Sequence, residues 1–413
     1  MKSLTTTILI LLLSFKIHTQ NQWVIYSPGN SGLPSNMVGS ILIDSNNVKW
    51  ITTSSGLAKF NGNNWFVYDT TNSGLPANAC GKIIKDKQNN IWITVSSKGV
   101  VKYDGFNWIV YNYENTGFPI NTTFSIAIDS SNNKWLGGIG LHKFNDTSWV
   151  RYHTGNSGIP GDIIFNVFAN DNIIWIGTSI AGVGRFDGQN WTTYNVYNSG
   201  LPSNEIHMIK SDIYNNIWFS TFGGGVSKFK YSQNIWTVYN TSNSGLHTNN
   251  THSIYVDNNN IKWIGASGCA VFNDTTWQIF PYSFIGDVFN FAKDRHGNMW
   301  ICCTRGLYVY NPTGVVGVEN VSTIVPENFL KIKNYPNPFN SETKIEIVIP
   351  KRTNLRLTIY DINGKLIKTV GEGNYNKGNY MFDFNGNNLA SGIYFIVLKT
   401  DKTIKTHKIV LQK

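Results

Sequence analysis

Cysteine is scarce in this chain of 413 residues, which contains four: Cys80, Cys269, Cys302 and Cys303. Their irregular spacing does not indicate the disulfide framework that stabilises many small secreted domains. The chain has no Cys-x-x-Cys pair and no Cys/His arrangement with the spacing of a zinc site. We therefore expect buried cysteines, and the sequence predicts neither a metal nor another cofactor.

Long hydrophobic runs are also scarce. The stretch from Ile8 to Phe15 follows Lys2 and is too short to span a bilayer, which takes about 20 apolar residues. A basic residue before a short apolar core is typical of a secretory signal peptide, which we assign to residues 1–20. No other stretch is long and apolar enough to anchor the chain, so the sequence predicts an exported protein.

Acidic residues are few, with 24 Asp and Glu against 34 Lys and Arg. The excess of positive charge lies mostly in residues 314–413, which hold 14 basic and 8 acidic side chains. The preceding body is nearly neutral and has no stripe of Lys and Arg, which argues against a nucleic-acid partner. Glu114 and Glu205 are the two glutamates before residue 315, so candidates for acid–base catalysis are rare.

Tryptophan, by contrast, is abundant and periodic. All 14 tryptophans fall into two series with one member of each per repeat. The first series follows turns such as DSNNVKWI and DKQNNIWI and comprises Trp50, Trp92, Trp135, Trp175, Trp218, Trp263 and Trp300. The second opens segments such as NNWFVY and comprises Trp23, Trp65, Trp108, Trp149, Trp191, Trp236 and Trp277. A fixed position in each repeat indicates core packing before ligand stacking.

Each repeat contains four short β-strand patterns. In the first repeat they cover residues 38–43, 48–53, 57–60 and 65–68, separated by turns rich in Gly, Asn, Asp and Ser. Four strands in about 40–45 residues are typical of a β-propeller blade. No segment has the length and periodicity of a helix.

The ends of the repeat region predict how the ring closes. The chain begins with a lone fourth-type strand at Trp23–Tyr26, and the last repeat stops after its third strand at 307–310. Pairing these fragments completes one blade and leaves no open sheet edge. The predicted fold class is all-β: a seven-bladed β-propeller over residues 21–313 with three-plus-one closure.

A recurring loop connects the blades. NSGLPSN occupies residues 30–36 and again 198–204, with the variants NSGLPAN, NTGFPIN, NSGIPGD and NSGLHTN elsewhere. We expect each loop to carry the chain from the outer strand of one blade to the inner strand of the next. Gly would permit unusual backbone angles, Pro would stiffen the link, and Asn or Ser would satisfy the turn backbone.

The repeats resemble a known family. GLPSNMVGSILIDSNNVKWITTSSGLAKFNG (32–62) and GLPSNEIHMIKSDIYNNIWFSTFGGGVSKF (200–229) are similar to two-component-regulator propeller repeats. Such repeats occur in the sensor regions of hybrid histidine kinases of the Bacteroidetes and in free-standing secreted proteins. Kinase-linked members continue into a membrane helix and cytoplasmic signalling domains, and no such pattern follows here. The resemblance, over roughly 21–313, therefore implies a secreted, kinase-free member.

A different pattern begins near residue 314. Residues 314–330 lack tryptophan and are typical of a linker. Residues 331–413 contain alternating strands such as 344–349, and an Asn-Gly turn at Asn363 is a strong hairpin signal. We expect a small Ig-like β-sandwich there.

This C-terminal segment resembles the type A sorting domain of type IX secretion cargo. The resemblance rests on the hairpin YDINGK, on SGIY, on the terminal KIVLQK, and on Asn334, Tyr335, Pro336, Asn337, Pro338 and Phe339. It implies recognition by the outer-membrane translocon and removal when cargo is released or attached to surface lipopolysaccharide. An ordinary Ig-like adhesion domain is the alternative, but it would leave the Pro-Asn-Pro segment unexplained.

Candidate site residues come from comparing inner strands across blades. Counting back from the turn acids places Gly39, Gly81, Phe124, Ile164, His207, His252 and Phe289 at one position. The position two residues earlier holds Met37, Ala79, Thr122, Asp162, Glu205, Asn250 and Asp287. We expect His207 and His252 to be neighbours, with Glu205 and Asp162 close by.

Arg305 should lie elsewhere on the same rim. These five residues are the candidate ligand-binding site, because two imidazoles and two carboxylates can coordinate a metal or transfer protons. Ordinary variation in a polar channel lining is the simpler alternative.

The remaining acids do not indicate catalysis. Most aspartates occupy the turn between the first two strands, where they are expected to hold hairpins: Asp44, Asp86, Asp129, Asp212, Asp257 and Asp294. No Ser/His/Asp motif or phosphate-binding loop stands out. The sequence favours a secreted or surface-attached module that binds a glycan or protein. An extracellular polysaccharide lyase or glycosidase is the alternative, and a purely structural adhesin is a third possibility.

Overall fold

The structure is a computed structural model that describes residues 22–116, 121–317, 331–349, 352–376, 378–400 and 404–413. The expected signal peptide, residues 1–20, lies outside the described residues. So does most of the expected linker, of which 314–317 are described.

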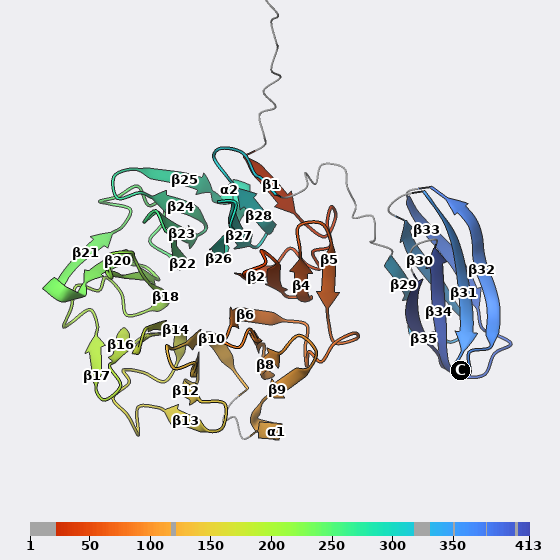
Figure 1. The fold of residues 1–413 in the computed structure, drawn as a ribbon, viewed down its shortest axis with the longest axis horizontal. Helices are drawn as coiled ribbons and strands as arrows, with labels where there is room; N and C mark the ends of the chain where they lie inside the picture. The colour runs from red at the N-terminus through yellow and green to blue at the C-terminus, as the bar shows by residue number, and fades with distance from the viewer. Residues whose placement is uncertain (1–21, 117–120, 318–330, 350–351, 377, 401–403) are drawn as a thin grey trace, which may run out of the picture.

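Seven four-stranded antiparallel sheets form a ring of blades, as Figure 1 shows along the ring axis. Blade 1 contains β2 (Val38–Ile43), β3 (Lys49–Thr53), β4 (Gly56–Phe60) and β5 (Trp65–Tyr68). Blade 2 contains β6 (Cys80–Lys85), β7 (Ile91–Val95), β8 (Gly99–Tyr103) and β9 (Trp108–Tyr111). Blade 3 contains β10 (Thr123–Ile128), β11 (Lys134–Gly138), β12 (Gly140–Phe144) and β13 (Trp149–Tyr152). Blade 4 contains β14 (Ile164–Asn170), β15 (Ile173–Thr178), β16 (Val183–Phe186) and β17 (Trp191–Tyr194). Blade 5 contains β18 (Ile206–Ser211), β19 (Ile217–Thr221), β20 (Gly225–Lys230) and β21 (Ile235–Tyr239). Blade 6 contains β22 (Thr251–Val256), β23 (Lys262–Ala266), β24 (Gly268–Phe272) and β25 (Trp277–Pro281). Each inner strand contacts the inner strands of both neighbouring blades.

Blade 7 closes the ring by the three-plus-one pairing that the sequence predicts. It combines β26 (Val288–Lys293), β27 (Met299–Cys303) and β28 (Gly306–Tyr310) with the N-terminal β1 (Trp23–Tyr26). Trp23 lies opposite Tyr310 in the ladder, and its ring centroid is 5.0 Å from those of Phe280 and Phe284. The closing strand therefore contributes both hydrogen bonds and buried aromatic surface.

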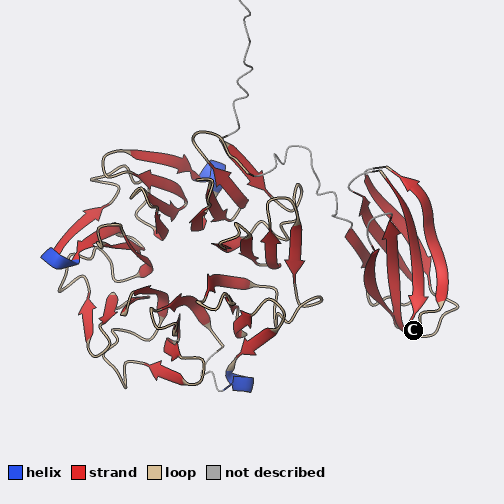
Figure 2. Ribbon diagram, in the orientation of Figure 1, coloured by secondary structure: helices blue, strands red, loops and turns tan. Residues whose placement is uncertain are grey.

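Helices are confined to short connections in the described part of the chain, as Figure 2 shows. They are α1 (Tyr113–Thr116), α2 (Tyr282–Ile285) and the 3-10 turn η1 (Tyr231–Gln233). The C-terminal region is a sandwich of a three-stranded sheet, in the order β29-β30-β33, and a four-stranded sheet, in the order β32-β31-β34-β35. Its strands are β29 (Lys331–Tyr335), β30 (Glu342–Ile349), β31 (Thr353–Asp361), β32 (Leu366–Tyr375), β33 (Gly378–Asn385), β34 (Gly392–Thr400) and β35 (Ile404–Leu411).

The tryptophans pack in the blades, as their periodicity predicts. Each outer tryptophan faces an aromatic residue across the ladder, as Trp65 does Phe60 with ring centroids 4.3 Å apart. In blade 2 the inner Trp92 donates its indole N–H to the carboxylate of Asp86 at 2.8 Å. Burial opposes ionisation of Asp86, but hydrogen bonds from Trp92 and Asn90 hold the pKa of this carboxyl below its usual value. The turn acid thus fixes its hairpin, and the same bond recurs in blades 3, 5 and 7.

The glycine of the connecting loop has a different role from the one we expected. Unusual backbone angles were the expected reason, but Gly32 and Gly200 do not have positive φ values. A Cβ atom on Gly32 would lie 2.2 Å from Cβ of Trp65, and one on Gly200 would lie 2.4 Å from Cβ of Trp236. Glycine is required because the loop backbone lies directly on the outer tryptophan, where no side chain fits.

Candidate functional site

A β-bulge at the start of every inner strand builds one end of the channel. In each blade the pairing of the inner strand with its neighbour shifts register at this point. A bulge leaves a residue unpaired and redirects its side chain. The residues at the bulge position are Gly39, Gly81, Phe124, Phe165, His207, His252 and Phe289. We call this end of the channel the mouth.

His207 and His252 lie side by side on blades 5 and 6, which confirms their expected proximity. Their Nδ1 atoms are 3.4 Å apart, and their rings are 5.5 Å apart at 23°. Nε2 of His207 is 2.8 Å from Oε1 of Glu205. The sequence therefore placed three of the five candidates in one hydrogen-bonded group.

The protonation of this group follows from its geometry. The Glu205 carboxylate can only accept, so Nε2 of His207 carries the proton that they share. When His207 is neutral, its Nδ1 accepts from Nδ1 of His252, which leaves a lone pair on Nε2 of His252. Burial first and His207 second lower the pKa of His252, while Asp287 and Glu205 raise it by less. At neutral pH the group therefore offers the uncharged imidazole of His252, next to the hydrogen-bonded pair of His207 and Glu205.

Aromatic rings continue the arc on both sides of His207. The ring of Phe165 meets that of His207 edge-on at 5.5 Å, and Phe124 lies 5.9 Å from Phe165. Phe222, in the loop between β19 and β20, stacks on the ring of His207 with ring centroids 5.8 Å apart. Phe124 is 40% exposed, so part of this aromatic surface is open to solvent.

A pocket of about 460 Å³ lies on the blade 1 to 3 side of the mouth. Gly39 and Gly81 occupy the bulge position there, so no side chain fills the space. Met37 and Phe124 contribute to its wall. The mouth is therefore asymmetric, with a hollow on one side and an aromatic and imidazole arc on the other.

Asp162 lies away from the imidazole pair. Its carboxylate accepts hydrogen bonds from the backbone N–H of Thr154 at 2.8 Å and from the Thr154 hydroxyl at 2.9 Å. Asn204 accepts the equivalent bond from Val196 in the next blade. Asp162 is thus the last residue of the connecting loop and not the counterpart of Glu205.

The alignment of the blades from sequence placed blade 4 out of register by one residue. This error explains why Asp162 was wrongly expected beside the imidazole pair. Ile164 pairs in the ladder opposite Thr178, and the bulge residue is Phe165. The first strand of this blade, β14, has seven residues and ends at Asn170, so counting back from a turn acid misaligns it. Counting forward from the loop proline aligns Phe165 with His207 and would have found the missed aromatic residue.

Arg305 lies on the rim in the loop between β27 and β28. Its guanidinium donates to the carbonyl oxygen of Ser283 and lies 5.2 Å from the ring centroid of Tyr282. Both partners belong to α2. Arg305 therefore holds this short helix against blade 7 and is separate from the imidazole pair.

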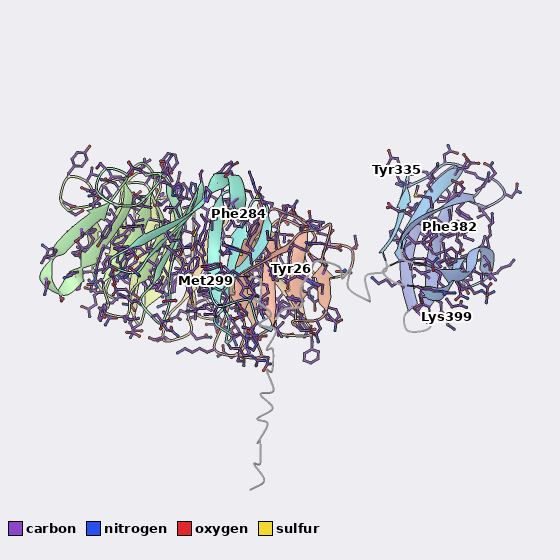
Figure 3. All side chains as sticks on the ribbon, turned by 90° about the horizontal axis from the view of Figure 1, so that it is seen from above. Tyr26, Phe284, Met299, Tyr335, Phe382 and Lys399 are labelled. Carbon is purple, nitrogen blue, oxygen red and sulfur yellow. The ribbon has the colours of Figure 1, made fainter. Side chains whose placement is uncertain are left out.

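The NYPNPF segment of the C-terminal sandwich braces the last strand. Oδ1 of Asn337 accepts the Val410 N–H at 2.9 Å, and its amide donates to the Lys408 carbonyl at 3.2 Å. Phe339 is buried in the sandwich core, whereas Tyr335 is 82% exposed. Figure 3 shows Tyr335 at the edge of the sandwich. The motif thus combines structural residues with an exposed aromatic ring.

Two negative findings apply to the described residues. They contain no group of three or more His, Cys, Asp or Glu side chains that could hold a metal ion. No helix among them is long and hydrophobic enough to cross a membrane.

Comparison with known proteins identifies the C-terminal region. Residues 333–412 match the family model of the secretion system C-terminal sorting domain. A domain of this family indicates export and interaction with the type IX secretion machinery. No curated protein matches the chain.

Solved structures share the fold of the chain at low sequence identity. The extracellular domains of a hybrid two-component system and of a one-component system from B. thetaiotaomicron are 16% and 15% identical, with TM-scores of 0.62 and 0.57, and cover 95% and 91% of this chain. The chain spans 58% and 57% of the length of those structures. A virginiamycin B lyase from Staphylococcus aureus is 13% identical, with a TM-score of 0.57, over 70% of this chain and 97% of that one.

At these identities the likeness concerns the fold alone. The chain thus joins a seven-bladed propeller, similar in fold to the extracellular domains of two-component systems, to a C-terminal sorting domain of the type IX secretion system.

Proposed function

We propose that the propeller is an extracellular binding module whose ligand, a glycan fragment or a protein, docks at the mouth. A signal peptide at residues 1–20 would start export, and the sorting domain, residues 331–413, would then direct the chain to the cell surface or the medium. The observation that carries this proposal is the ring of bulges, which brings the side chains of five blades to a single opening and leaves a hollow at the glycines of blades 1 and 2.

The composition of the mouth suits such ligands. Phe124, Phe165 and Phe222 offer aromatic faces that can stack on apolar sugar or side-chain surfaces. Glu205 and the His207–His252 pair supply polar groups in fixed positions. Apolar surface with a few oriented polar groups on a rigid scaffold is the usual construction of a binding site. Arg305 adds a cation to the rim, and Asp162 shapes the adjoining loop.

An extracellular lyase or glycosidase remains the second candidate because of the Glu205–His207–His252 chain. A carboxylate hydrogen-bonded to an imidazole, with a second neutral imidazole beside it, can accept and donate protons. Detection of cleaved glycan would distinguish an enzyme from a protein that only binds its ligand.

The test is a glycan and peptide array probed with the mature full-length chain. We expect saturable binding that Phe165→Ala and Glu205→Gln weaken by tenfold or more. Phe66→Ala is the matched control, because Phe66 is also an exposed aromatic residue, 52% exposed, but lies on the outer strand β5. Binding that survives both mouth substitutions would refute the proposal, and turnover abolished by Glu205→Gln would establish the enzyme instead.

A further inference from the structure

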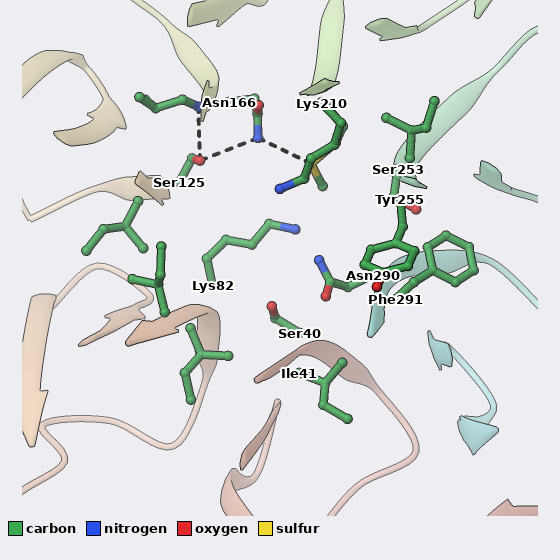
Figure 4. Close-up of a pocket in the computed structure, with 16 residues that line it drawn as sticks. Ser40, Ile41, Lys82, Ser125, Asn166, Lys210, Ser253, Tyr255, Asn290 and Phe291 are labelled. Atoms are coloured by element: carbon green, nitrogen blue, oxygen red, sulfur yellow. Dashed lines mark hydrogen bonds between the residues drawn. The ribbon is translucent and has the colours of Figure 1, made fainter. Parts of the chain in front are cut away.

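A second ring of side chains lines the channel below the mouth. It consists of the residues that directly follow the bulge position: Ser40, Lys82, Ser125, Asn166, Met208, Ser253 and Asn290. They enclose a cavity of about 240 Å³, shown in Figure 4. A water molecule takes about 30 Å³ of liquid, so the cavity has room for a small hydrated ion.

Two ammonium groups reach into this cavity. Lys82 extends from β6 in blade 2 and Lys210 from β18 in blade 5, and Figure 4 shows both side chains directed toward its centre. Nζ of Lys210 also lies 5.4 Å from the ring centroid of Phe168. The two cations thus converge from strands that are three blades apart.

No acid balances this charge within the cavity. The described lining residues include no Asp or Glu. Burial first, and the positive charge of Lys210 second, lower the pKa of Lys82 to about 8, and burial also lowers the pKa of Lys210. Buried charges are normally paired, because an unpaired one loses its hydration without compensation.

The fold does not require lysine at the position of Lys82. Blades 1, 3 and 6 have serine where blade 2 has Lys82, and blade 5 has Met208. The hydroxyl of Ser40 and the amide of Asn290 stand on the same ring as Lys82 and can donate hydrogen bonds (Figure 4). The cavity therefore has the charge and the donors that an anion needs.

We propose that the central channel binds a small oxyanion between Lys82 and Lys210, with Ser40 and Asn290 as additional donors. The ligand class is an anion of the size of sulfate, phosphate or a short dicarboxylate. This site is distinct from the mouth and does not depend on the function proposed for it.

The direct test is calorimetric titration of the full mature chain with sulfate, phosphate and malonate at constant ionic strength, with chloride as the reference. Lys82→Met introduces the residue that blade 5 carries at this position, and Lys210→Met removes the second cation. Lys85→Met is the matched control, because Lys85 lies on the same strand but does not line the cavity. We expect saturable binding of at least one oxyanion, weakened tenfold or more by each cavity substitution and unchanged by the control.

Thermal unfolding distinguishes an anion-binding role of the lysines from a purely structural one. In anion-free buffer at pH 7 we expect Lys82→Met to unfold at a higher temperature than the wild type, and saturating oxyanion to close the gap. The gap should also narrow as the pH rises from 8 toward 10, because Lys82 loses its charge there. The other titratable groups that face it are Lys210, Tyr255 and Cys302. Absence of saturable binding, or equal affinity in wild type and both cavity variants, would overturn the proposal.

Discussion

His142 should make the propeller sensitive to mild acid. It lies in β12 of blade 3, is fully buried, and faces Arg151 across the ladder. Burial first, and the charge of Arg151 second, lower the pKa of His142 to about 4 from an ordinary value of 6.5. The folded protein therefore keeps this imidazole neutral at pH values where the unfolded chain protonates it.

The size of the effect follows from proton linkage. Neutral His142 contributes fully to the stability of the folded state above pH 6.5. This stability is lost as the pH falls toward 4, because the unfolded chain gains the proton first. Each pKa unit corresponds to about 1.4 kcal/mol. Lowering the pH from 7 to 5 should thus reduce the free energy of unfolding by about 2 kcal/mol through this residue alone.

His142→Val isolates this contribution, because Val101 fills the equivalent buried position in blade 2. Urea unfolding followed by tryptophan fluorescence, at pH 7 and at pH 5, gives the loss of stability for each protein. The wild type should lose about 2 kcal/mol more than the variant. Other histidines with a pKa lowered by burial, His252 and His407 among them, are common to both proteins, so their contributions cancel in the difference. Equal losses in the two proteins would refute the assignment of a buried, neutral His142.

Four further predictions concern stability, export and reactivity. Trp92→Phe removes a buried N–H donor to a carboxylate. It should lower the free energy of unfolding by about 1.5–3 kcal/mol more than Trp50→Phe, because the indole nitrogen of Trp50 has no partner in the described structure. Equal losses of stability in urea titrations would contradict this. Asn337→Ala should lower the melting temperature of the C-terminal sandwich, because two hydrogen bonds to the last strand are lost. Tyr335→Ala should leave that temperature unchanged but reduce the amount of chain in the medium, and normal export would exclude recognition of the exposed ring. The four cysteines are buried and free, with raised thiol pKa values, so a colorimetric thiol reagent should label none in the native chain and all four in denaturant.

The ring could be predicted from sequence because its information is repeated seven times. A misread turn in one blade leaves the tryptophan series intact, and the fragments at Trp23–Tyr26 and Gly306–Tyr310 determine the closure. The same redundancy placed His207 beside His252, since residues at one position of adjacent blades must be neighbours.

The details of the site were harder to predict because they depend on local departures from the repeat. The bulges have no sequence signature of their own, and the seven-residue β14 displaced the alignment of Asp162 and concealed Phe165. Lys82 and Lys210 occupy different positions on strands from distant blades, so only the closed ring reveals that they share a cavity. Crowding by Trp65, which explains Gly32, is likewise invisible in a single sequence.

The ring can close only late in synthesis, because β1 comes from the N-terminus and its partner β28 from the last blade. A chain that leaves a translocation pore amino terminus first presents β1 long before its partner β28, which emerges about 280 residues later. Until β28 pairs with β1, the incomplete ring has two unpaired sheet edges, which are prone to pair with other chains. Completion of the ring therefore depends on the last blade, and a truncation there would leave an open ring with β1 unpaired instead of a closed ring with fewer blades.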